Sequence, residues 1–276
     1  MFYIRKVSLA AVISAFSLVI AIPARAASFT NGDFGTGNFT GWNTAGFTYI
    51  DGTDSVGQAY PHPANTSNEA QIVTFDSETF YNNTQQDISP SNLETQLGLP
   101  SGIFASQAQN VLSGSGISQT VALNAGQTVS FTYDFLTNEP VGTANGARYN
   151  DFAFFQASSA GYTSPLETIA SITSSSFNQV TTAPDFLYDT GFKTYLFTVP
   201  TSGTYNIGVG VTNVGPPDSN GLTTGGGSDS FPSAILASNF TVAAAVPEPS
   251  FAPGIMSLFA VGSVLHYQRR RKQKQQ

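Results

Sequence analysis

Short segments in the middle of the chain alternate between apolar and polar residues. In the clearest one, residues 128–135 (TVSFTYDF), Val, Phe, Tyr and Phe alternate with Thr, Ser, Thr and Asp. Successive side chains of a β-strand point to opposite faces, so this pattern predicts a strand with one face in a core and the other in water. Spacing typical of an amphipathic helix is nearly absent from this region.

Two pairs of alternating segments are separated by residues that favour turns. The first pair, residues 116–123 and 128–135, flanks Asn-Ala-Gly, and the second pair, residues 195–199 and 205–211, flanks Pro-Thr-Ser-Gly. Turn residues between two alternating segments are typical of a β-hairpin. The sequence therefore predicts two hairpins with matched alternation.

Two further segments are apolar at both sets of alternating positions. They are residues 151–156 (DFAFFQ) and 234–242 (AILASNFTV). Strands of this kind are buried on both faces, as in the interior of a sandwich. Together with the regularly spaced turns, they predict an all-β fold, an antiparallel β-sandwich. We find no internal repeat and no linker, so we expect one domain over residues 27–243.

Two segments depart from the strand pattern. Residues 91–94 (SNLE) match a capping box, and Gly98 and Pro100 follow, which predicts one short helix of one or two turns inserted between strands. Residues 213–230 contain five glycines and two adjacent prolines, which predicts a long surface loop.

Charge is distributed unevenly along the chain. Between residues 28 and 246 the only cations are Arg148 and Lys193, against sixteen of the seventeen acids, a formal charge of −14. Such a surface repels phosphate backbones, which argues against a nucleic-acid partner. It suits an exported protein or one that collects divalent cations. The chain has no cysteine, so neither disulfides nor thiolate chemistry are available.

The first 26 residues have the features of a secretory signal peptide. Arg5 and Lys6 precede an apolar run over residues 7–22, and Ala24-Arg-Ala26 forms a small-residue cleavage pattern. We expect signal peptidase to cut after Ala26. The alternative is an uncleaved membrane anchor.

The last 26 residues begin with a second apolar segment. Residues 251–267 contain no acid, lysine or arginine and would form a helix about 25 Å long, the lower limit for crossing a bilayer. A basic cluster follows directly, and basic residues tend to stay in the cytoplasm, so it predicts a stop for a transmembrane helix. The cluster consists of Arg269, Arg270, Arg271 and Lys272.

A short proline-containing motif precedes this apolar segment. Pro247, Glu248 and Pro249 lie within VPEPS, and the prolines keep the peptide extended and accessible beside the membrane. The motif, the short apolar helix and the terminal arginines, in this order, resemble the PEP-CTERM sorting signal over residues 244–276. The resemblance implies recognition of the motif by an exosortase-type membrane protease and removal of the anchor. It also implies transient association with the inner membrane, delivery to the cell surface or extracellular matrix, and exopolysaccharide as a partner.

The body of the chain shows a looser resemblance. Residues 29–42 (FTNGDFGTGNFTGW) are similar to the opening strand and turn of PEP-CTERM proteins and of jelly-roll carbohydrate-binding modules. Residues 135–139, 149–152 and 234–242 resemble blocks of the same exported family. The resemblance implies a jelly-roll-like sandwich.

Catalytic constellations are poorly represented in this sequence. His62, between two prolines, is the only histidine before the tail, and one histidine without cysteine cannot build a zinc site. The carboxylate pairs Asp76 with Glu78 and Asp185 with Asp189 exist, but their spacing says nothing about a shared cleft. We therefore expect no enzyme; the alternative is a polysaccharide-acting enzyme on the same scaffold.

Calcium is the metal that the composition favours, because it binds to carboxylate, amide and carbonyl oxygens. Asn138 and Glu139 end one predicted strand, and Asn150 and Asp151 begin another. If those strand ends meet, four side chains would offer oxygen ligands. The alternative is that these are ordinary strand-end residues.

Aromatic residues raise the question of sugar binding, since an aromatic ring can stack on the apolar face of a pyranose. Trp42 and the surface tyrosines are the candidates, although a core position is the better prediction for Trp42. The sequence thus predicts an exported, non-catalytic surface or matrix protein with a structural or glycan-binding sandwich. A permanently anchored single-pass surface protein is the alternative.

Overall fold

The structure is a computed structural model of the 276-residue chain. It describes residues 27–51, 68–74, 86–107, 110–141, 149–173, 175–180, 186–215 and 231–245. The predicted signal peptide, the sorting tail and most of the predicted loop at 213–230 lie outside these residues and remain predictions, as do the domain boundaries. Among the described residues, no helix has the length and apolar character needed to cross a membrane.

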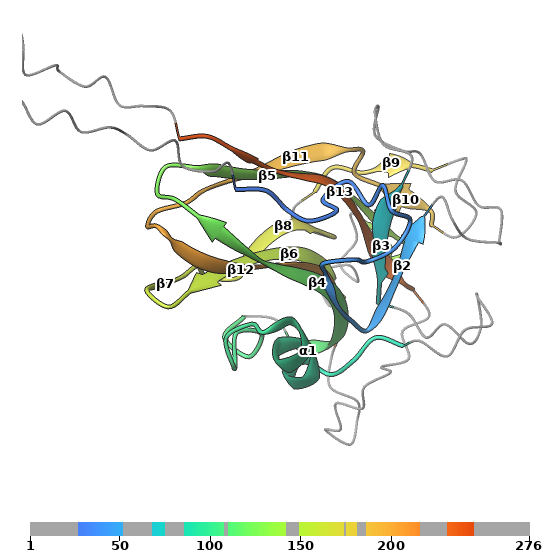
Figure 1. Ribbon diagram of the computed structural model, residues 1–276. Coiled ribbons are helices and arrows are strands. Elements are labelled where there is room, and N and C mark those ends of the chain that lie inside the picture. Colours follow the sequence, from blue (N-terminus) through green and yellow to red (C-terminus); the bar gives the residue numbers. More distant parts are fainter. Residues whose placement is uncertain are drawn as a thin grey trace, which may run out of the picture.

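Two antiparallel sheets pack face to face, with one short helix outside them (Figure 1). The predicted β-sandwich with an inserted helix is therefore confirmed. In chain order the elements are β1 (Asn43–Ala45), β2 (Phe47–Asp51), β3 (Glu69–Val73), α1 (Pro90–Leu97), β4 (Val111–Leu123), β5 (Thr128–Thr137), β6 (Phe152–Ser159), β7 (Tyr162–Thr163), β8 (Glu167–Ser171), β9 (Asn178–Gln179), β10 (Tyr188–Asp189), β11 (Lys193–Thr198), β12 (Gly203–Val214) and β13 (Ser233–Ala243).

The six-stranded sheet has the order β1-β4-β12-β6-β7, with β8 also paired to β6. The seven-stranded sheet has the order β2-β3-β13-β5-β10-β9, with β11 also paired to β5. Both β6 and β13 lie inside their sheets, as their continuous apolar character predicts.

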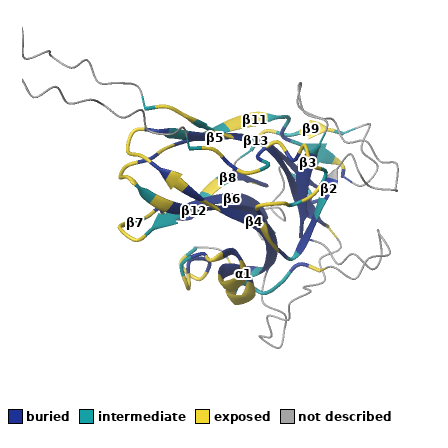
Figure 2. Cartoon of the chain, in the orientation of Figure 1, coloured by how far each residue is buried: buried dark blue, intermediate teal, exposed yellow. Residues whose placement is uncertain are grey.

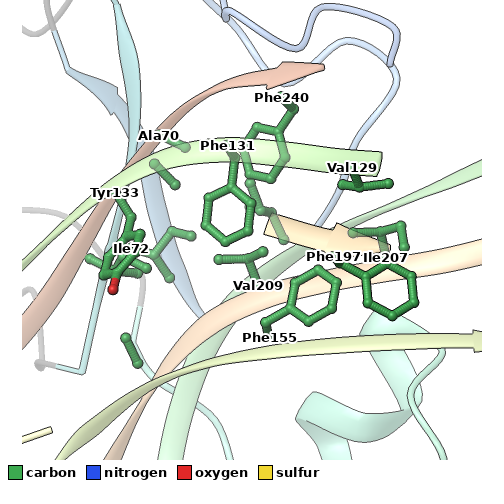
Figure 3. Close-up of a cluster of buried hydrophobic side chains, with 14 of the residues drawn as sticks. Ala70, Ile72, Val129, Phe131, Tyr133, Phe155, Phe197, Ile207, Val209 and Phe240 are labelled. Atoms are coloured by element: carbon green, nitrogen blue, oxygen red, sulfur yellow. The ribbon is translucent and has the colours of Figure 1, made fainter. Parts of the chain in front are cut away.

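The main core fills the space between the two sheets (Figure 3). Phe131 of β5 stacks on Phe240 of β13, with ring centroids 4.8 Å apart, and on Phe155 of the opposite sheet, at 6.1 Å. The alternation read from residues 128–135 is confirmed for the apolar set of β5, which faces this core, whereas Asp134 of the polar set is buried and not in water as predicted.

The two predicted hairpins are wrong as pairings, although their strands exist. β4 belongs to the six-stranded sheet and β5 to the seven-stranded sheet, so residues 124–127 cross between sheets. In the same way, β11 pairs with β5 while β12 pairs with β4. The physical reason is that two strands facing each other across a core show the same alternation and the same turn residues as a hairpin does.

The two crossings lie side by side and hydrogen-bond to each other. The Gly126 amide donates to the Val199 carbonyl oxygen and the Val199 amide donates to the Gln127 carbonyl oxygen, both at 2.8 Å. The Ala125 amide donates to Ser202 Oγ at 2.9 Å. These bonds satisfy backbone groups that a hairpin would have satisfied within one sheet.

Helix α1 confirms the predicted short helix but not its predicted cap. The N-cap residue is Ser89, with proline at the first helical position, and no side chain caps the helix. Glu94 is buried and turns away from the N-terminus. Its carboxylate accepts hydrogen bonds from the amides of Gly102, at 2.8 Å, and Phe104, at 3.2 Å. Glu94 therefore fixes the loop that follows the helix, whereas a capping box would have directed it backward.

Helix α1 and this loop cover the outer face of the six-stranded sheet (Figure 1). Glycines on that face allow the close approach. A Cβ on Gly116 would lie 2.6 Å from Leu97 Cδ1, and one on Gly208 would lie 2.7 Å from Leu99 Cδ2. Because these glycines have no side chain, Leu97 and Leu99 pack directly on the sheet and form part of a second apolar cluster outside the sandwich.

Candidate functional site

The opening segment at residues 29–42 forms turns that end in the core. Trp42 is 7% exposed and packs against Phe240, with ring centroids 4.6 Å apart, and its indole Nε1 donates to the Asn31 carbonyl oxygen at 3.1 Å. The prediction that Trp42 is a core residue is confirmed, and its ring offers no exposed surface for a sugar.

The first half of the predicted calcium set follows β5. The Asn138 Oδ1 atom accepts a hydrogen bond from the Leu187 amide at 2.7 Å, so it holds the segment before β10. The Glu139 side chain is fully buried, and its own amide donates to Thr137 Oγ1 at 2.9 Å. These contacts fit the alternative interpretation of strand-end residues.

The second half of the set precedes β6. Asn150 Oδ1 accepts hydrogen bonds from the amide and the hydroxyl of Thr173, at 2.9 and 3.0 Å. Asp151 is fully buried, and its Oδ1 accepts from the Val214 amide at 2.7 Å. Within the described ranges, no three histidine, aspartate or glutamate side chains gather as they would around a metal ion. Calcium binding by these four residues stays a prediction.

Several other candidates fall where the structure gives no description. These are His62, Asp76, Glu78, Arg148 and Asp185, together with the sorting motif and the basic cluster of the tail. Asp189 is described: it ends β10, and its Oδ1 accepts from the amide of Gly191 at 3.1 Å. The predicted carboxylate pairs are therefore not tested.

Two tyrosines at the side of the sandwich, the half-exposed Tyr195 and the buried Tyr133, join the two sheets. The Tyr195 hydroxyl of β11 donates to Glu167 Oε2 of β8, and the Tyr133 hydroxyl donates to the Ile169 carbonyl oxygen at 2.9 Å. Burial, and then the Glu167 bond, raise the pKa of Tyr195 above its ordinary value. Both hydroxyls are thus used in closing the fold.

Sequence reasoning missed a continuous surface on the outer face of the seven-stranded sheet. The register aligns Thr194 with Thr132, Leu196 with Ser130 and Thr198 with Thr128, and Thr241 of β13 lies beside Ser130. We call this surface the hydroxyl face. It consists of Thr128, Ser130, Thr132, Thr194, Leu196, Thr198 and Thr241, all exposed or half-exposed. Figure 2 draws much of β11 in the colour of exposed residues.

The hydroxyl face carries no charged side chain. Within β5, β11 and β13 the only charged residues are Asp134 and Lys193, both at the same end of the face. One contact inside the face is a hydrogen bond of 2.8 Å between the Ser130 and Thr241 hydroxyls. The polar half of the alternation at 128–135 was the available signal, but the neighbouring strands could not be assigned from sequence.

A buried polar group borders this surface. Gln71 of β3 and Asp134 of β5 both flank Leu236 of β13 and face the same side as the hydroxyl face. Gln71 is fully buried, and among the described residues neither of its amide atoms has a hydrogen-bond partner. Ser238, one row nearer the hydroxyl face, is also buried with its hydroxyl unpartnered within the same part of the chain.

Asp134 has an unusual environment for a carboxylate. It is 1% exposed, and burial, followed by the nearby charge of Asp189, raises its pKa to about 7. The amide and hydroxyl of Thr190 donate to Asp134 Oδ1 at 3.1 and 3.0 Å and oppose part of this rise. Asp134 therefore holds β10 and β11 against β5.

Comparisons with known proteins give similarities of fold only. No family model matches the chain, and no curated protein matches it. Among solved structures, TmCBM61 in complex with β-1,4-galactotriose is 12% identical, with 80% of this chain and 99% of that chain covered and a TM-score of 0.37. The K1 cleaved adhesin domain of Lys-gingipain from Porphyromonas gingivalis W83 is 12% identical, with 77% and 95% covered and a TM-score of 0.37. The CBM22-1 xylan-binding domain of Paenibacillus barcinonensis Xyn10C is 12% identical, with 79% and 94% covered and a TM-score of 0.32.

Proposed function

We propose that the chain is an exported surface or matrix protein whose non-catalytic sandwich binds an uncharged glycan on the hydroxyl face. The observation that carries the proposal is a row-by-row array of exposed hydroxyls, without charge, on a body of formal charge −14 between residues 28 and 246. A neutral patch on an acidic protein favours a neutral ligand over a polyanion.

The chemistry of the face matches a polyhydroxylated ligand. Each serine or threonine hydroxyl donates one hydrogen bond and accepts others, as each sugar hydroxyl does. Leu196, 64% exposed between the hydroxyl rows, supplies an apolar contact for the C–H surface of a sugar ring. A hydrogen bond that replaces one to water contributes only about 1 kcal/mol, so we expect weak binding that depends on several contacts at once.

The buried group beside the face adds a second point of recognition. A buried amide without partners costs stability, and a ligand hydroxyl would remove that cost once the side chains that cover the fully buried Gln71 move aside. Ser238 lies between Gln71 and the exposed hydroxyl rows, so a ligand would approach Gln71 from the side of Ser238.

A glycan array tests this function. The purified full chain, with and without calcium, should bind uncharged glycans. The double variant Thr132→Val/Thr194→Val keeps the side-chain shape and removes two hydroxyls, and it should weaken binding by about tenfold or more. The control Thr163→Val/Thr204→Val changes two exposed threonines of the six-stranded sheet and should bind as the parent does. Absence of any glycan signal, or equal affinities for the two double variants, would reject the site.

Thermal unfolding with and without calcium tests the predicted metal set separately. If Asn138, Glu139, Asn150 and Asp151 hold calcium, its removal should lower the thermal midpoint of the full chain. An unchanged midpoint would favour their structural role in strand ends, which the contacts of Asn138 and Asn150 support.

The sorting half of the proposal rests on the tail residues. We propose that an exosortase-type protease recognises Pro247, Glu248 and Pro249 and removes the apolar segment. The mature protein should then end before residue 251, and mass spectrometry would measure this. Recovery of residues 251–276 still attached would favour a permanent anchor, and alanine at the three motif positions should block maturation.

A further inference from the structure

Among the strands that the structure describes, β11 lies at a free edge of the seven-stranded sheet (Figure 1). It pairs with β5 along one side over six residues, and no described strand pairs with its other side. A free edge presents unpaired backbone groups that can join another strand, and natural proteins usually guard such edges with charges, prolines or short strands.

The other edges in the described part of the molecule carry these guards. β1, β7 and β9 are two or three residues long. β2 includes Asp51, and β8 includes Glu167. In β11 the only charge is Lys193 at its first position, and residues 194–199 (TYLFTV) contain no charge, proline or glycine. Uncharged segments of six such residues are the typical template for strand pairing between chains.

The backbone hydrogen bonds show which residues of β11 face outward. Val199 donates to Gln127 and accepts from Gly126, both at 2.8 Å, so its backbone groups point toward the β5 side. Direction alternates along an antiparallel strand. The N–H and C=O groups of Thr194, Leu196 and Thr198 therefore point away from β5, toward the free edge.

We propose that β11 is a self-association edge that pairs antiparallel with β11 of a second copy of this chain. Hydrogen-bonded pairs must join outward-facing residues, so the register places Leu196 opposite Leu196 of the second copy. Thr194 then lies opposite Thr198 of the second copy. The three outward positions are symmetric about Leu196, so the strand is complementary to itself around a two-fold axis.

Charge also favours a second copy at this edge. Two bodies that each carry −14 repel one another over most of their surface, and residues 194–199 are a neutral strip where they can touch. About six backbone hydrogen bonds form in this register, which is a small contact. The association is therefore weak in dilute solution and grows with concentration. This proposal does not depend on glycan binding.

Sedimentation of the full chain at increasing concentration tests the proposal. The parent should move from the mass of one chain toward that of two. Leu196→Lys places two like charges opposite each other and should abolish this shift. Leu187→Lys is the matched control, since Leu187 is 53% exposed and lies outside β11, and it should associate as the parent does. If Leu196→Lys still moves toward the mass of two chains as the parent does, for example because the chains associate through the apolar tail, the proposal is overturned. A parent that keeps the mass of one chain at every concentration would overturn it as well.

Cysteine cross-linking tests the register itself, because the chain has no native cysteine. The Cα atoms of a hydrogen-bonded antiparallel pair lie about 5.5 Å apart. A short bis-maleimide should link Leu196→Cys into a covalent dimer at least tenfold faster than Leu187→Cys. Equal rates for the two variants would indicate random collision and overturn the proposed pairing.

Discussion

The outer faces of the two sheets differ in what covers them. On the six-stranded sheet, α1 and the loop after it bury an apolar cluster that includes Leu97, Leu99 and Phe154. On the seven-stranded sheet, a smaller apolar cluster that includes Phe186 and Leu236 covers one end of the outer face, and β5, β11 and β13 expose the hydroxyl face at the other end. Both faces belong to sheets whose inner sides share one core, so the difference lies in residues that contribute nothing to that core.

This difference shows how one sandwich separates stability from surface chemistry. The covered face carries glycines where the helix approaches closely, and these positions cannot change without displacing α1. The exposed face carries threonines and serines, whose β-propensity keeps the strands intact while their hydroxyls stay available. Substitutions should therefore separate cleanly by face.

The largest expected difference comes from two leucine truncations. Leu97→Ala removes a fully buried side chain beneath α1 and should lower the free energy of unfolding by about 3 kcal/mol. Leu196→Ala, on the exposed face, should change it by less than about 0.5 kcal/mol. Denaturant titration of both variants measures this. Equal losses would mean that the two faces are covered alike.

A glycine substitution should have the next largest effect. A Cβ on Gly210 would lie 2.3 Å from the Ser115 carbonyl oxygen and 2.7 Å from Phe154 Cζ. Gly210→Ala should therefore cost about 2 kcal/mol through displaced packing. Gly161→Ala is the control, because a Cβ there meets no atom within 4 Å. A neutral Gly210→Ala would show that β4 and Phe154 make room for the added Cβ more easily than the contacts indicate.

Asp134→Asn should change the free energy of unfolding by an amount that depends on pH. The folded pKa of Asp134, about 7, lies above its unfolded value of 3.8, so its ionisation destabilises the fold. This cost is fully present above pH 7 and disappears as pH falls from 7 toward 4. The variant should be more stable than the parent at pH 8 and nearly equal to it at pH 4. A gain of the same size at both pH values would contradict the assignment.

The smallest expected change in stability comes from replacing two buried glutamines, one on the outer side of each sheet. Gln71 and Gln156 are both fully buried, and neither has a side-chain hydrogen-bond partner among the described residues. Methionine at either position should raise stability by about 1 kcal/mol, because it removes an unsatisfied amide of similar volume. Only Gln71→Met should also weaken glycan binding. Loss of binding in both variants, or in neither, would remove Gln71 from the proposed site.

The sequence by itself determined six of the strands, the short helix and the apolar side of β5. These strands are β4, β5, β6, β11, β12 and β13. Alternation at residues 128–135 correctly assigned Phe131 to the core and Thr132 to the surface, because the side-chain period of a strand is local. The same local reasoning placed Trp42 in the core, and continuous apolar residues marked β6 and β13 as interior strands. Local reasoning was wrong about Glu94: the spacing from Ser91 fits a capping box, but the Glu94 carboxylate binds the loop that follows the helix.

Only the tertiary structure decided which strands are neighbours. The turns at residues 124–127 and 199–202 carry the residues of hairpins, yet both cross between sheets and bond to each other. Alternation records only that a strand has a buried side, and that side is the same whether the next strand lies beside it or across the core. The hydroxyl face and the free edge of β11 depend on that choice of neighbours, so they emerge only when the two sheets are assembled.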